Sequence, residues 1–554
     1  MKWFISRFVV NVILLVCLLF ELFFPSQAFS AGVQEKGLNS SLIMGGDVSM
    51  LQEVEERGAE FFENGVQKDA LEIMSNGGMD LVRLRLWVDP YDSEGNDYGG
   101  GTNDLEETIA LARRAKTEGM GFMLNFHYSD FWADPGKQNK PKAWEELSYE
   151  VLVQTVYDYT KNTMIQLEGE GLIPDMVQIG NEITSGMLWN HGRVGDGYGD
   201  FTQLAELLMA GINGIHDGIR NSENVEIVLH LDHGGDNQLY RWWFDEITEQ
   251  GVEFDIIGLS YYPFWHGAMG ELKYNLNDIS RRYDKDVMVV ETSYGFTLED
   301  GDGLGNSFYT EEEAIGGYGA SVQGQMNFLR DLKAIVAEVP EQRGRGVIWW
   351  EPAWLPVEGA NWGSEAGATY NNDTGLLSNP WDNQTLFDFD GNVLETLSVF
   401  GEGMRENLVY NPSFEMDDWT NEPSGWGVWS ANSNDYHAIF TERPGVVGDY
   451  KLTHWKDTAY TVSTYQVLTG LEDGLYSFSA WILNSGGQDS VYMYAKNYGG
   501  SELQIDLPVS PEIWTKVSIE NIEVINGQCE IGVISYANEG TWMNFDGVSF
   551  IRND

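Results

Sequence analysis

Two short apolar runs in the sequence each end on a carboxylic acid that could take part in catalysis. The run MVQI (176–179) leads into Asn181 and Glu182, and the run DVMVV (286–290) leads into Glu291. If both runs are parallel strands, their ends meet at one edge of a sheet. Two neighbouring carboxyl groups suit hydrolysis of a glycosidic bond, because one protonates the leaving oxygen while the other attacks or activates water. An Asn-Glu pair by itself is equally consistent with a solvated surface.

The two runs belong to a pattern that recurs along the chain. A short apolar run ends on polar or aromatic residues and is followed by a stretch of helical period. The strand candidates are 41–49, 80–87, 121–128, 175–182, 225–232, 255–262, 286–291 and 346–351. Helix-like segments between them cover 105–119, 151–168, 201–219, 239–250 and 322–339. Eight such alternations predict an α/β fold, a (β/α)₈ TIM barrel with long loops.

A barrel of this type carries its active site at the C-terminal ends of its strands, and polar residues gather there in this sequence. They are Asp47, Ser49, Arg83, Arg85, His127, Asp130, Asn181, Glu182, Asp232, His233, Tyr261, Tyr262, Glu291, Trp349, Trp350 and Glu351. This convergence favours a catalytic site more strongly than either motif does. The alternatives are a buried ion pair for the two arginines and a hydrogen-bonded core residue for His127.

Around Asn407 the pattern changes to short alternating strands with Gly, Asn, Asp and Ser turns. This pattern of short strands and turns predicts a C-terminal β-sandwich of jelly-roll type. Its turn-rich stretches contain many aromatic residues, which indicates a binding module. We therefore expect a signal peptide at 1–30, the catalytic barrel at 31–404 and the β-sandwich module at 405–554.

The net charge of the chain limits which molecules it can bind. The 554 residues include 32 Lys and Arg against 86 Asp and Glu, a formal net charge of -54. Such a field repels phosphate backbones and anionic membranes, so we expect no nucleic-acid binding and a neutral substrate. The 20 Trp and 26 Tyr residues exceed what a core requires, and flat rings of this kind stack on the apolar faces of sugars.

The N-terminus predicts export. Lys2 and Arg7 precede an apolar run from Phe8 to Phe24, and small residues follow near Ser30. This is the layout of a secretory signal peptide, so we expect a secreted, extracellular protein with no stable membrane insertion after cleavage. An uncleaved membrane anchor is the alternative. Cleavage removes Cys17 and leaves Cys529 as the only thiol, which excludes an internal disulfide.

Several motifs together resemble the endo-β-1,4-galactanases of glycoside hydrolase family 53, in the retaining clan of barrel enzymes. They run from about Gly45 to Phe400 and include LVRLRLWVDP, NFHYSDFWADPGKQ, VQIGNEITSGMLW, IIGLSYYPFWHG, VVETSYG, IWWEPAW and DNQTLFDFDG. The resemblance implies that Glu182 is the acid/base and Glu291 the nucleophile. It also implies cleavage of β-1,4-galactan, as in type I arabinogalactan side chains of pectin, by a monomer that needs no organic cofactor.

Further site residues follow from the same resemblance. Arg83 would keep Glu291 ionised and Tyr262 would donate a hydrogen bond to it, while the charge of Glu291 would raise the pKa of Glu182. Asn181 is expected to hold a sugar 2-hydroxyl, and Trp350 to form the floor of the subsite where the bond breaks. The remaining predicted substrate contacts are His127, Asp130, Trp132, Asp134 and Lys137.

A glycine-rich acidic loop after the nucleophile predicts a calcium site. Asp300, Asp302 and Asn306 offer side-chain oxygens and Leu304 its carbonyl, which suits a cation that binds six to eight oxygens. No flanking helix pair is evident, so an EF-hand is rejected. Calcium in this loop is implied by the resemblance to bacterial family 53 enzymes, and an ordinary Gly/Asp turn is the alternative.

The C-terminal region resembles galactan-binding modules of carbohydrate-binding family 61. In modules of this kind the first Glu and the last Asp, here Glu415 and Asp546, often hold a second structural calcium. Two rival functions stay open at this point. One is an enzyme of the same clan with another specificity, such as a mannanase or xylanase; the other is a glycan-binding surface protein without activity.

Overall fold

The structure is a computed structural model that describes residues 42–553 with gaps at 196, 198–199 and 404–406. The predicted signal peptide therefore lies outside the described residues. Within the described part of the chain, no helix combines the length and the apolar character of a membrane span.

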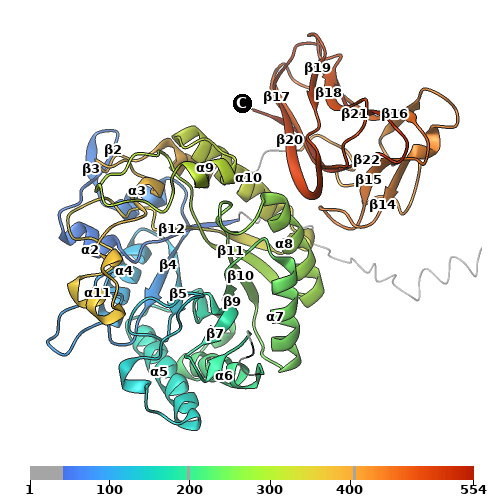
Figure 1. The fold of residues 1–554 in the computed structure, drawn as a ribbon. Helices are drawn as coiled ribbons and strands as arrows, with labels where there is room; N and C mark the ends of the chain where they lie inside the picture. The colour runs from blue at the N-terminus through green and yellow to red at the C-terminus, as the bar shows by residue number, and fades with distance from the viewer. Residues whose placement is uncertain (1–41, 196, 198–199, 404–406, 554) are drawn as a thin grey trace, which may run out of the picture. The chain divides into compact units, whose positions relative to one another are not determined.

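Eight parallel strands close into a barrel in the order β1-β12-β11-β10-β9-β6-β5-β4, which confirms the predicted fold class (Figure 1). The strands are β1 (Ile43–Asp47), β4 (Leu81–Leu86), β5 (Gly121–Phe126), β6 (Met176–Ile179), β9 (Glu226–Leu231), β10 (Ile256–Ser260), β11 (Asp286–Thr292) and β12 (Gly344–Trp350). The bounds of each differ by at most three residues from those of a predicted run, because a buried parallel strand is a short, largely apolar segment that hydrophobicity reveals.

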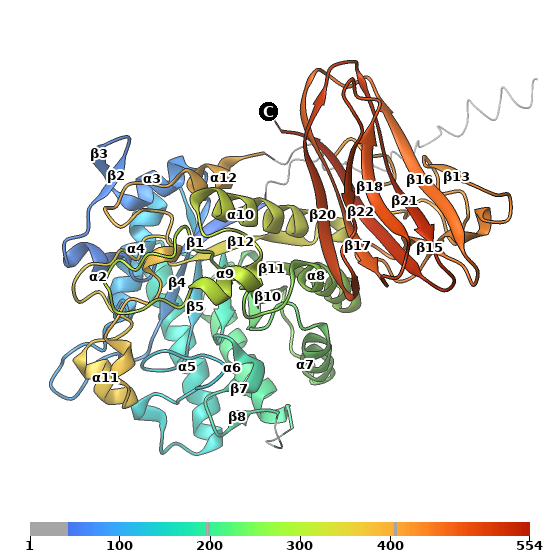
Figure 2. The same cartoon turned by 45° about the horizontal axis from the view of Figure 1, so that its top comes forward.

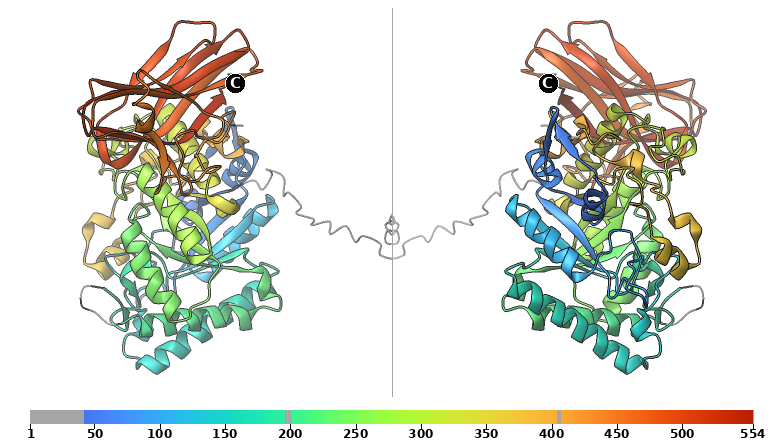
Figure 3. Two further views of the ribbon diagram at one scale, coloured as in Figure 1. Left: turned by 90° about the vertical axis from the view of Figure 1, so that its right-hand side faces the viewer. Right: turned by 90° about the vertical axis from the view of Figure 1, so that its left-hand side faces the viewer.

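Helices surround the barrel, as the views in Figure 1 and Figure 3 show. They are α2 (Leu51–Glu56), α3 (Ala70–Asn76), α4 (Leu105–Thr117), α5 (Tyr149–Gly169), α6 (Thr202–Gly218), α7 (Asn237–Glu249), α8 (Met269–Tyr283), α9 (Thr310–Gly316), α10 (Val322–Ala337), α11 (Glu365–Asn371) and α12 (Ser398–Gly401). Several start at a capping side chain: Asp104 accepts from the Glu107 amide before α4, and Asp236 accepts from the Leu239 amide before α7. Such caps satisfy amides that have no partner within the helix and fix where it begins.

The barrel interior changes character along its length. Its N-terminal half is filled by an apolar cluster to which most of the strands contribute, comprising Leu81, Met123, Met176, Val228, Ile256, Met288, Val290 and Ile348. Two residues further along β4, β5, β6 and β9 the inward positions are polar, namely Arg83, Asn125, Gln178 and His230. A plug of apolar side chains thus supports a polar C-terminal end, where this architecture places chemistry.

The C-terminal strands form two five-stranded antiparallel sheets, which confirms the predicted β-sandwich (Figure 2). One sheet has the order β13-β16-β21-β18-β19 and the other β14-β15-β22-β17-β20. Their bounds are β13 (Gly427–Ser430), β14 (Ile439–Glu442), β15 (Lys451–Trp455), β16 (Tyr460–Thr469), β17 (Gly474–Asn484), β18 (Ser490–Lys496), β19 (Leu503–Asp506), β20 (Ser510–Val524), β21 (Gln528–Ala537) and β22 (Trp542–Arg552). Cys529 is buried in this core.

Candidate active site

A cavity of about 260 Å³ opens at the C-terminal ends of the barrel strands. Residues from seven of the eight strands or their exits line it: Arg83, Arg85, His127, Asn181, Glu182, Asp232, Tyr262, Glu291 and Trp350. Loop residues complete the wall, among them Trp132, Asp134, Trp265, Trp362 and Trp381. Both carboxyl groups singled out in the sequence therefore face the same space.

Glu182 reaches the cavity through an unusual backbone path. Gly180 has φ 76° and Glu182 itself has φ 47°, so the chain leaves β6 through two left-handed residues. Glycine adopts this region freely, but a glutamate does so at a cost of about 1–3 kcal/mol. The surrounding contacts must hold Glu182 there, and strain of this kind is concentrated at functional sites.

Glu291 is turned into the cavity by a β-bulge. Met288 and Val290 of β11 belong to the apolar plug, so regular alternation would point Glu291 away from it. Between β10 and β11 the pairing shifts from Leu259 opposite Val289 to Ser260 opposite Glu291. The extra residue reverses the alternation and presents the carboxyl group at the mouth of the barrel.

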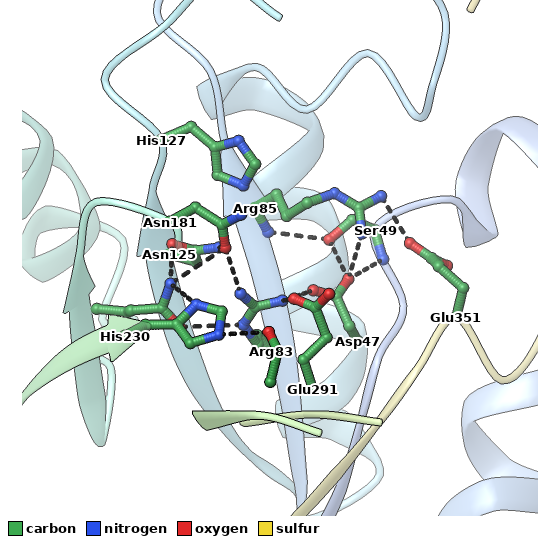
Figure 4. A network of polar contacts seen from close by, with 12 residues as sticks. Asp47, Ser49, Arg83, Arg85, Asn125, His127, Asn181, His230, Glu291 and Glu351 are labelled. Carbon is green, nitrogen blue, oxygen red and sulfur yellow. Dashed lines mark hydrogen bonds and ion pairs between the residues drawn. The ribbon is translucent and has the colours of Figure 1, made fainter. Parts of the chain in front are cut away.

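Arg83 joins the two catalytic motifs (Figure 4). Its Nη1 contacts Asp47 Oδ2 at 2.7 Å and Glu291 Oε2 at 3.2 Å, and its Nη2 donates to Asn181 Oδ1 at 2.7 Å. Tyr262 donates to the other oxygen of Glu291 at 3.1 Å. The planar guanidinium thus fixes Glu291 and Asn181 relative to each other, which a lysine could not do.

A second arginine extends this ionic network below the cavity rim (Figure 4). Arg85 contacts Asp47 at 2.9 Å and Glu351 at 2.6 Å, with all three side chains almost fully buried. Desolvation raises the pKa of Glu351 to about 8, against the opposing effect of Arg85. Both arginines thus form the buried ion pair suggested as the alternative, and both also line the cavity, where Arg83 contacts Glu291.

A neutral chain of hydrogen bonds supports Glu182. Gln178 Nε2 lies 3.1 Å from His230 Nδ1, His230 Nε2 lies 2.8 Å from Ser260 Oγ, and Ser260 donates to Glu182 Oε1 at 2.7 Å. Because Gln178 Nε2 can only donate, His230 must carry its proton on Nε2, and the Ser260 proton must point to Glu182. Desolvation lowers the pKa of His230 well below its usual value, so the ring stays uncharged.

This chain leaves one oxygen of Glu182 free for a proton. Oε1 accepts from Ser260, so the proton of the acid form belongs on Oε2. We name the three residues Gln178, His230 and Ser260 the neutral relay. Since both ring nitrogens of His230 are engaged in it, we assign the cluster of Glu182, His230 and Glu291 to hydrogen bonding rather than to metal binding.

The two carboxyl groups are in unequal electrostatic surroundings. Desolvation first, and then the charge of Glu291, raises the pKa of Glu182 well above its usual range. Desolvation also raises the pKa of Glu291, but Arg83 and the Tyr262 hydroxyl act in the opposite direction. When the pair holds one proton, it therefore resides on Glu182. The expected effect of Glu291 on Glu182 is present, but removal from water is the larger cause.

His127 presents an unpartnered donor to the cavity. Its Nδ1 accepts from the Trp87 indole at 3.2 Å and from the Ala133 amide at 3.3 Å, so the proton lies on Nε2. That Nε2 is buried without a hydrogen-bond partner. Desolvation lowers the pKa of His127 well below its usual value, which keeps the ring neutral. A buried donor left unpaired costs about 1–3 kcal/mol, so its place in the cavity wall marks a contact for a ligand.

Indole rings form the remaining wall. Trp132 stacks on Trp362 with centroids 4.7 Å apart, and Trp350 meets Trp381 edge to face at 4.6 Å. The Arg85 guanidinium lies 4.6 Å from the Trp132 ring centre and fixes the inner end of this group. The cavity therefore combines paired carboxyl groups with flat apolar surfaces, the combination that suits a sugar ring.

Comparison with known proteins places the chain in a family. Residues 43–400 match the model of glycosyl hydrolase family 53. The chain belongs to this family.

Relatives within glycosyl hydrolase family 53 cover the barrel. An endo-β-1,4-galactanase of Bacillus subtilis is 38% identical over 66% of this chain and 86% of its own length. An arabinogalactan endo-β-1,4-galactanase of Humicola insolens is 33% identical over 66% of this chain and 99% of its own. The solved family 53 catalytic domain of Ignisphaera aggregans is 42% identical, covers 66% of this chain and 97% of its own, and has a TM-score of 0.61. The enzyme class predicted from the sequence, a glycosidase, is thereby confirmed.

The other predicted substrate contacts of this family 53 site differ in whether they line the cavity. Asp134 lines the cavity, and its partner Lys137 lies beside it, 3.3 Å away, on the exposed rim. Asp130 lies behind the wall, where its carboxylate accepts from the Asp89 and Lys142 amides and so ties two loops together. Asn181 lines the cavity and donates one amide proton to the Ala133 carbonyl, which leaves its second proton for a hydroxyl.

The predicted calcium loop gains a ligand from a distant segment. Asp300, Asp302 and Asp382 have carboxyl oxygens within 4.8 Å of one another. Asn306 donates to Asp382 at 2.8 Å, while its own Oδ1 is buried without a partner. Desolvation raises the pKa of Asp382 to about 6, with the charges of Asp302 and Asp300 adding to it. Three converging carboxylates and an unpaired oxygen fit a hard cation such as calcium.

The predicted ligands of a second calcium ion, Glu415 and Asp546, have different surroundings. Glu415 accepts from the Asp449 and Tyr450 amides, and Asp546 accepts from the Val446 amide at 2.7 Å. Both carboxylates thus contact the loop 445–450, but they do so through N–H groups rather than beside other oxygens. The structure therefore supplies a hydrogen-bonding role for both residues, and the second calcium stays a prediction.

Sequence analysis did not single out several residues of the two sites, among them Gln178, His230, Ser260, Trp265, Trp362, Trp381 and Asp382. The first three are polar residues inside apolar strand runs, and that anomaly is the signal that could have found them. Nothing local distinguishes Asp382, which lies about eighty residues from the loop it completes.

Proposed function

We propose that the chain is a secreted endo-β-1,4-galactanase that cleaves with retention, with Glu182 as acid/base and Glu291 as nucleophile. The observation that carries the mechanism is the proximity of the two groups, since one oxygen of Glu182 lies within 4.8 Å of one oxygen of Glu291. Retaining glycosidases hold their carboxyl groups about 5–5.5 Å apart, whereas inverting enzymes leave about 6.5–9.5 Å for a water molecule.

The first chemical step uses the unequal protonation of the pair. Glu182 Oε2 transfers its proton to the glycosidic oxygen as the bond to C1 breaks, and ionised Glu291 forms a bond to C1. The leaving chain departs as an alcohol and a glycosyl ester of Glu291 remains. As Glu182 becomes charged, the Ser260 hydroxyl stabilises the new carboxylate.

The second step reverses the roles of the two groups. Ionised Glu182 takes a proton from a water molecule, the water oxygen bonds to C1, and the ester bond to Glu291 breaks. Two inversions give net retention. Arg83 and Tyr262 stabilise the departing Glu291 carboxylate, since both contact its oxygens.

The proposed substrate rests on the relatives and on the charge of the site. The relatives in bacteria and fungi are named as enzymes acting on β-1,4-galactan or arabinogalactan. The uncharged donor of His127 and the indole walls suit a neutral sugar chain, and a net charge of -54 disfavours an anionic one. The signal-peptide pattern supports secretion to meet such a polymer.

We further infer that the loop 300–306 and Asp382 hold a structural calcium ion. Asp300, Asp302 and Asp382 would supply carboxylate oxygens, Asn306 its unpaired Oδ1 and Leu304 its carbonyl. The ion would neutralise a cluster of three acids and so stabilise the loop. Elemental analysis of the purified protein tests this inference: one bound calcium supports this loop alone, and two would extend it to Glu415 and Asp546.

Product analysis on linear β-1,4-galactan, β-mannan, xylan and cellulose tests the reaction. We expect short galacto-oligosaccharides from galactan alone, and the β anomer as the first product in NMR spectra. Glu291→Ala should abolish cleavage, and Glu182→Gln should lower kcat by about 10²–10⁴. Glu170→Gln is the matched control, because this exposed carboxyl group pairs with Arg113 at 2.7 Å and does not line the cavity.

Azide assigns the two roles separately. With an aryl galactoside that needs no acid, Glu182→Ala with azide should yield the β-galactosyl azide, because azide attacks the glycosyl ester. Glu291→Gly with azide should yield the α-galactosyl azide, because azide takes the place of the carboxylate. The reverse pattern would exchange the assignments, and cleavage of mannan or xylan would transfer the mechanism to another substrate.

A further inference from the structure

The segment by which the chain leaves β6 has carbonyl groups that the barrel sheet does not pair. The strand ends at Ile179, and its pairing with β5 and β9 extends no further. The residues 180–182 then turn away from the sheet, with positive φ at Gly180 and Glu182. Gly180 and Asn181 are buried and Glu182 is half-buried. Buried carbonyl oxygens need a donor, so the side chains that supply one decide where Glu182 lies.

Two glutamine side chains supply these donors. Gln178 Nε2 lies 2.9 Å from the Gly180 carbonyl oxygen, and Gln138 Nε2 lies 2.7 Å from the Asn181 carbonyl oxygen. The same nitrogen of Gln138 lies 3.4 Å from the Glu182 carbonyl oxygen. An amide group has two protons to donate. One side chain therefore holds the carbonyl groups before and after the Cα atom of Glu182.

Gln138 belongs to the loop between β5 and α5, which also lines the cavity. The Gln138 amide lies 3.2 Å from the Asp134 carbonyl oxygen of its own loop. Asp134 and Lys137 form a short hairpin there, with backbone hydrogen bonds of 2.9 and 3.0 Å. Asn181 contacts the same loop, since its Nδ2 donates to the Ala133 carbonyl at 2.9 Å. The loop 133–138 and the exit of β6 are thus joined by two side-chain amides, one from each segment.

The side chain of Gln138 has no direct access to a substrate. Gln138 is 1% exposed, and it does not line the cavity. Its backbone carbonyl accepts from the Trp189 amide at 2.8 Å, which fixes the loop from a third segment. In the motif ADPGKQ the family resemblance gave roles to Asp134 and Lys137 but none to this glutamine. Any effect of Gln138 on the reaction must therefore pass through the residues that it holds.

We propose that Gln138 is a positioning residue, which holds Glu182 in its left-handed conformation and aligns it with the loop 133–138. This role rests on the proposed function, because it concerns Glu182 as the acid/base. Without the Gln138 amide, the buried Asn181 carbonyl loses its donor and the strained backbone at Glu182 loses a restraint. The carboxyl group then moves away from the glycosidic oxygen, and a displacement of about 1 Å costs about 100-fold in rate.

The leaving group distinguishes a misplaced acid from a general loss of structure. Gln138→Met keeps the length of the side chain but removes its donor. On a galacto-oligosaccharide, whose leaving oxygen needs a proton, we expect kcat/KM to fall about 10- to 100-fold. On an aryl galactoside that needs no acid, we expect kcat/KM to fall by less than about threefold. Both are measured well below the Tm of each variant. A merely structural role would lower both values by the same factor.

Gln138→Glu provides a second readout. A protonated carboxyl group donates to the Asn181 carbonyl, whereas a carboxylate cannot donate and is repelled by it. The titratable side chains near position 138 are Asp134, Lys137 and Glu182, and they are the same in Gln138→Met. The kcat/KM of Gln138→Glu, divided by that of Gln138→Met, should therefore rise as the pH falls from about 8 to about 5, since burial favours the protonated form.

Gln325→Met is the matched control. Gln325 is fully buried, and its Nε2 donates to the carbonyl groups of Tyr294 at 2.8 Å and Thr385 at 3.0 Å. None of these three residues lines the cavity. We expect this variant to have a lower Tm but the wild-type ratio between the two values of kcat/KM. The same selective loss in Gln325→Met as in Gln138→Met would overturn the positioning role.

Glu182→Gln, measured beside these variants, keeps the two proposals apart. It should lose activity on the galacto-oligosaccharide and retain it on the aryl galactoside. If it shows no such selectivity, the acid/base assignment is wrong. If Glu182→Gln is selective but Gln138→Met loses equally on both substrates, the positioning role alone is wrong. A ratio of Gln138→Glu to Gln138→Met that stays constant with pH would also overturn that role.

Discussion

Removal of the Ser260 hydroxyl tests the neutral relay most directly. Ser260 is fully buried and donates to Glu182 Oε1 at 2.7 Å. During the first step Glu182 loses its proton, so this hydrogen bond changes from one with a neutral acid to one with a carboxylate. Hydrogen bonds to charged groups contribute about 1.5–3 kcal/mol, more than neutral ones. Ser260→Ala should therefore lower kcat/KM by about 10- to 150-fold.

The pH profile gives the second readout of the same variant. The Ser260 hydrogen bond lowers the pKa of Glu182, against desolvation, which raises it. Without the hydroxyl the pKa of Glu182 rises further, so the acid form persists to higher pH. The basic limb of kcat/KM reports the loss of that acid form, and it should move upward in pH. Measurement of kcat/KM on galacto-oligosaccharides between pH 4 and 10 checks the shift.

A matched variant separates this effect from a general loss of packing. Ser293 is also fully buried and donates to Gln384 at 2.7 Å, without contact to Glu182. Ser260→Ala removes the partner of both His230 and Glu182, whereas Ser293→Ala removes a hydrogen bond to Gln384 alone. Ser293→Ala should therefore lower Tm by no more than Ser260→Ala does, and it should leave the basic limb in place. With an aryl galactoside whose leaving group needs no proton, Ser260→Ala should lose much less activity in the first step. An unmoved basic limb in Ser260→Ala, or equal losses in both variants, would refute the relay.

Three further predictions address other parts of the barrel. Tyr262→Phe removes a donor that lowers the pKa of Glu291, so that pKa should rise, the acidic limb of kcat/KM should move to higher pH, and kcat/KM should fall about tenfold or more. His127→Phe removes the unpaired donor and also the acceptor of the Trp87 indole and the Ala133 amide, so we expect Tm to fall and kcat/KM to fall about 3- to 10-fold; a lower Tm with full activity would contradict a ligand contact. Calcium at a hundredfold excess over its Kd should stabilise the wild-type protein by about 2.7 kcal/mol, so its Tm should be higher with calcium than with a chelator. Asp382→Asn should abolish this difference in Tm. A wild-type Tm that does not respond to chelation would contradict the calcium site.

The barrel could be predicted because its strands satisfy a local rule. Each is a short apolar run whose side chains contact either the plug or the helices, so hydrophobicity alone reveals it. Alternation along β4 also predicts that Arg83 and Arg85 share one face, since Leu81 two residues earlier belongs to the plug. Their meeting with Asp47 follows from the closure of the barrel, which is a property of the whole set of strands.

The orientation of Glu291 could not be predicted from alternation. Met288 and Val290 point into the plug, so a regular strand would direct Glu291 outward, toward the helices. The bulge that corrects this arises from pairing with β10 and has no signature in the run DVMVV. Its place at a strand end marked Glu291 as a candidate catalytic group, and the resemblance to a known family assigned it the role of nucleophile in advance.

Contacts between distant loops were equally inaccessible. The glycine-rich loop 300–306 indicated a cation site, but Asp382 completes the acidic cluster from a turn far along the chain. Conversely, Asp130 has the residue type and position of a substrate contact, yet two backbone amides occupy its oxygens. Which strand-end residues face the cavity depends on how the loops fold back, and strand periodicity contains no information about that.

The assignment of roles to the two glutamates follows from what supports each of them. Glu291 contacts a guanidinium that is itself paired with Asp47, so a fixed positive charge accompanies it through the reaction. Glu182 contacts a serine whose partners, His230 and Gln178, are uncharged and oriented by hydrogen bonding alone. A cation favours the ionised form at all times, whereas a neutral donor on one oxygen tolerates the acid and stabilises the carboxylate when it forms. The charge of the residues that contact each glutamate, Arg83 for Glu291 and Ser260 for Glu182, therefore sets which carboxyl group donates the proton. A cation introduced beside Glu182 would keep it ionised, so the protein would lose its general acid while Glu291 stayed a nucleophile.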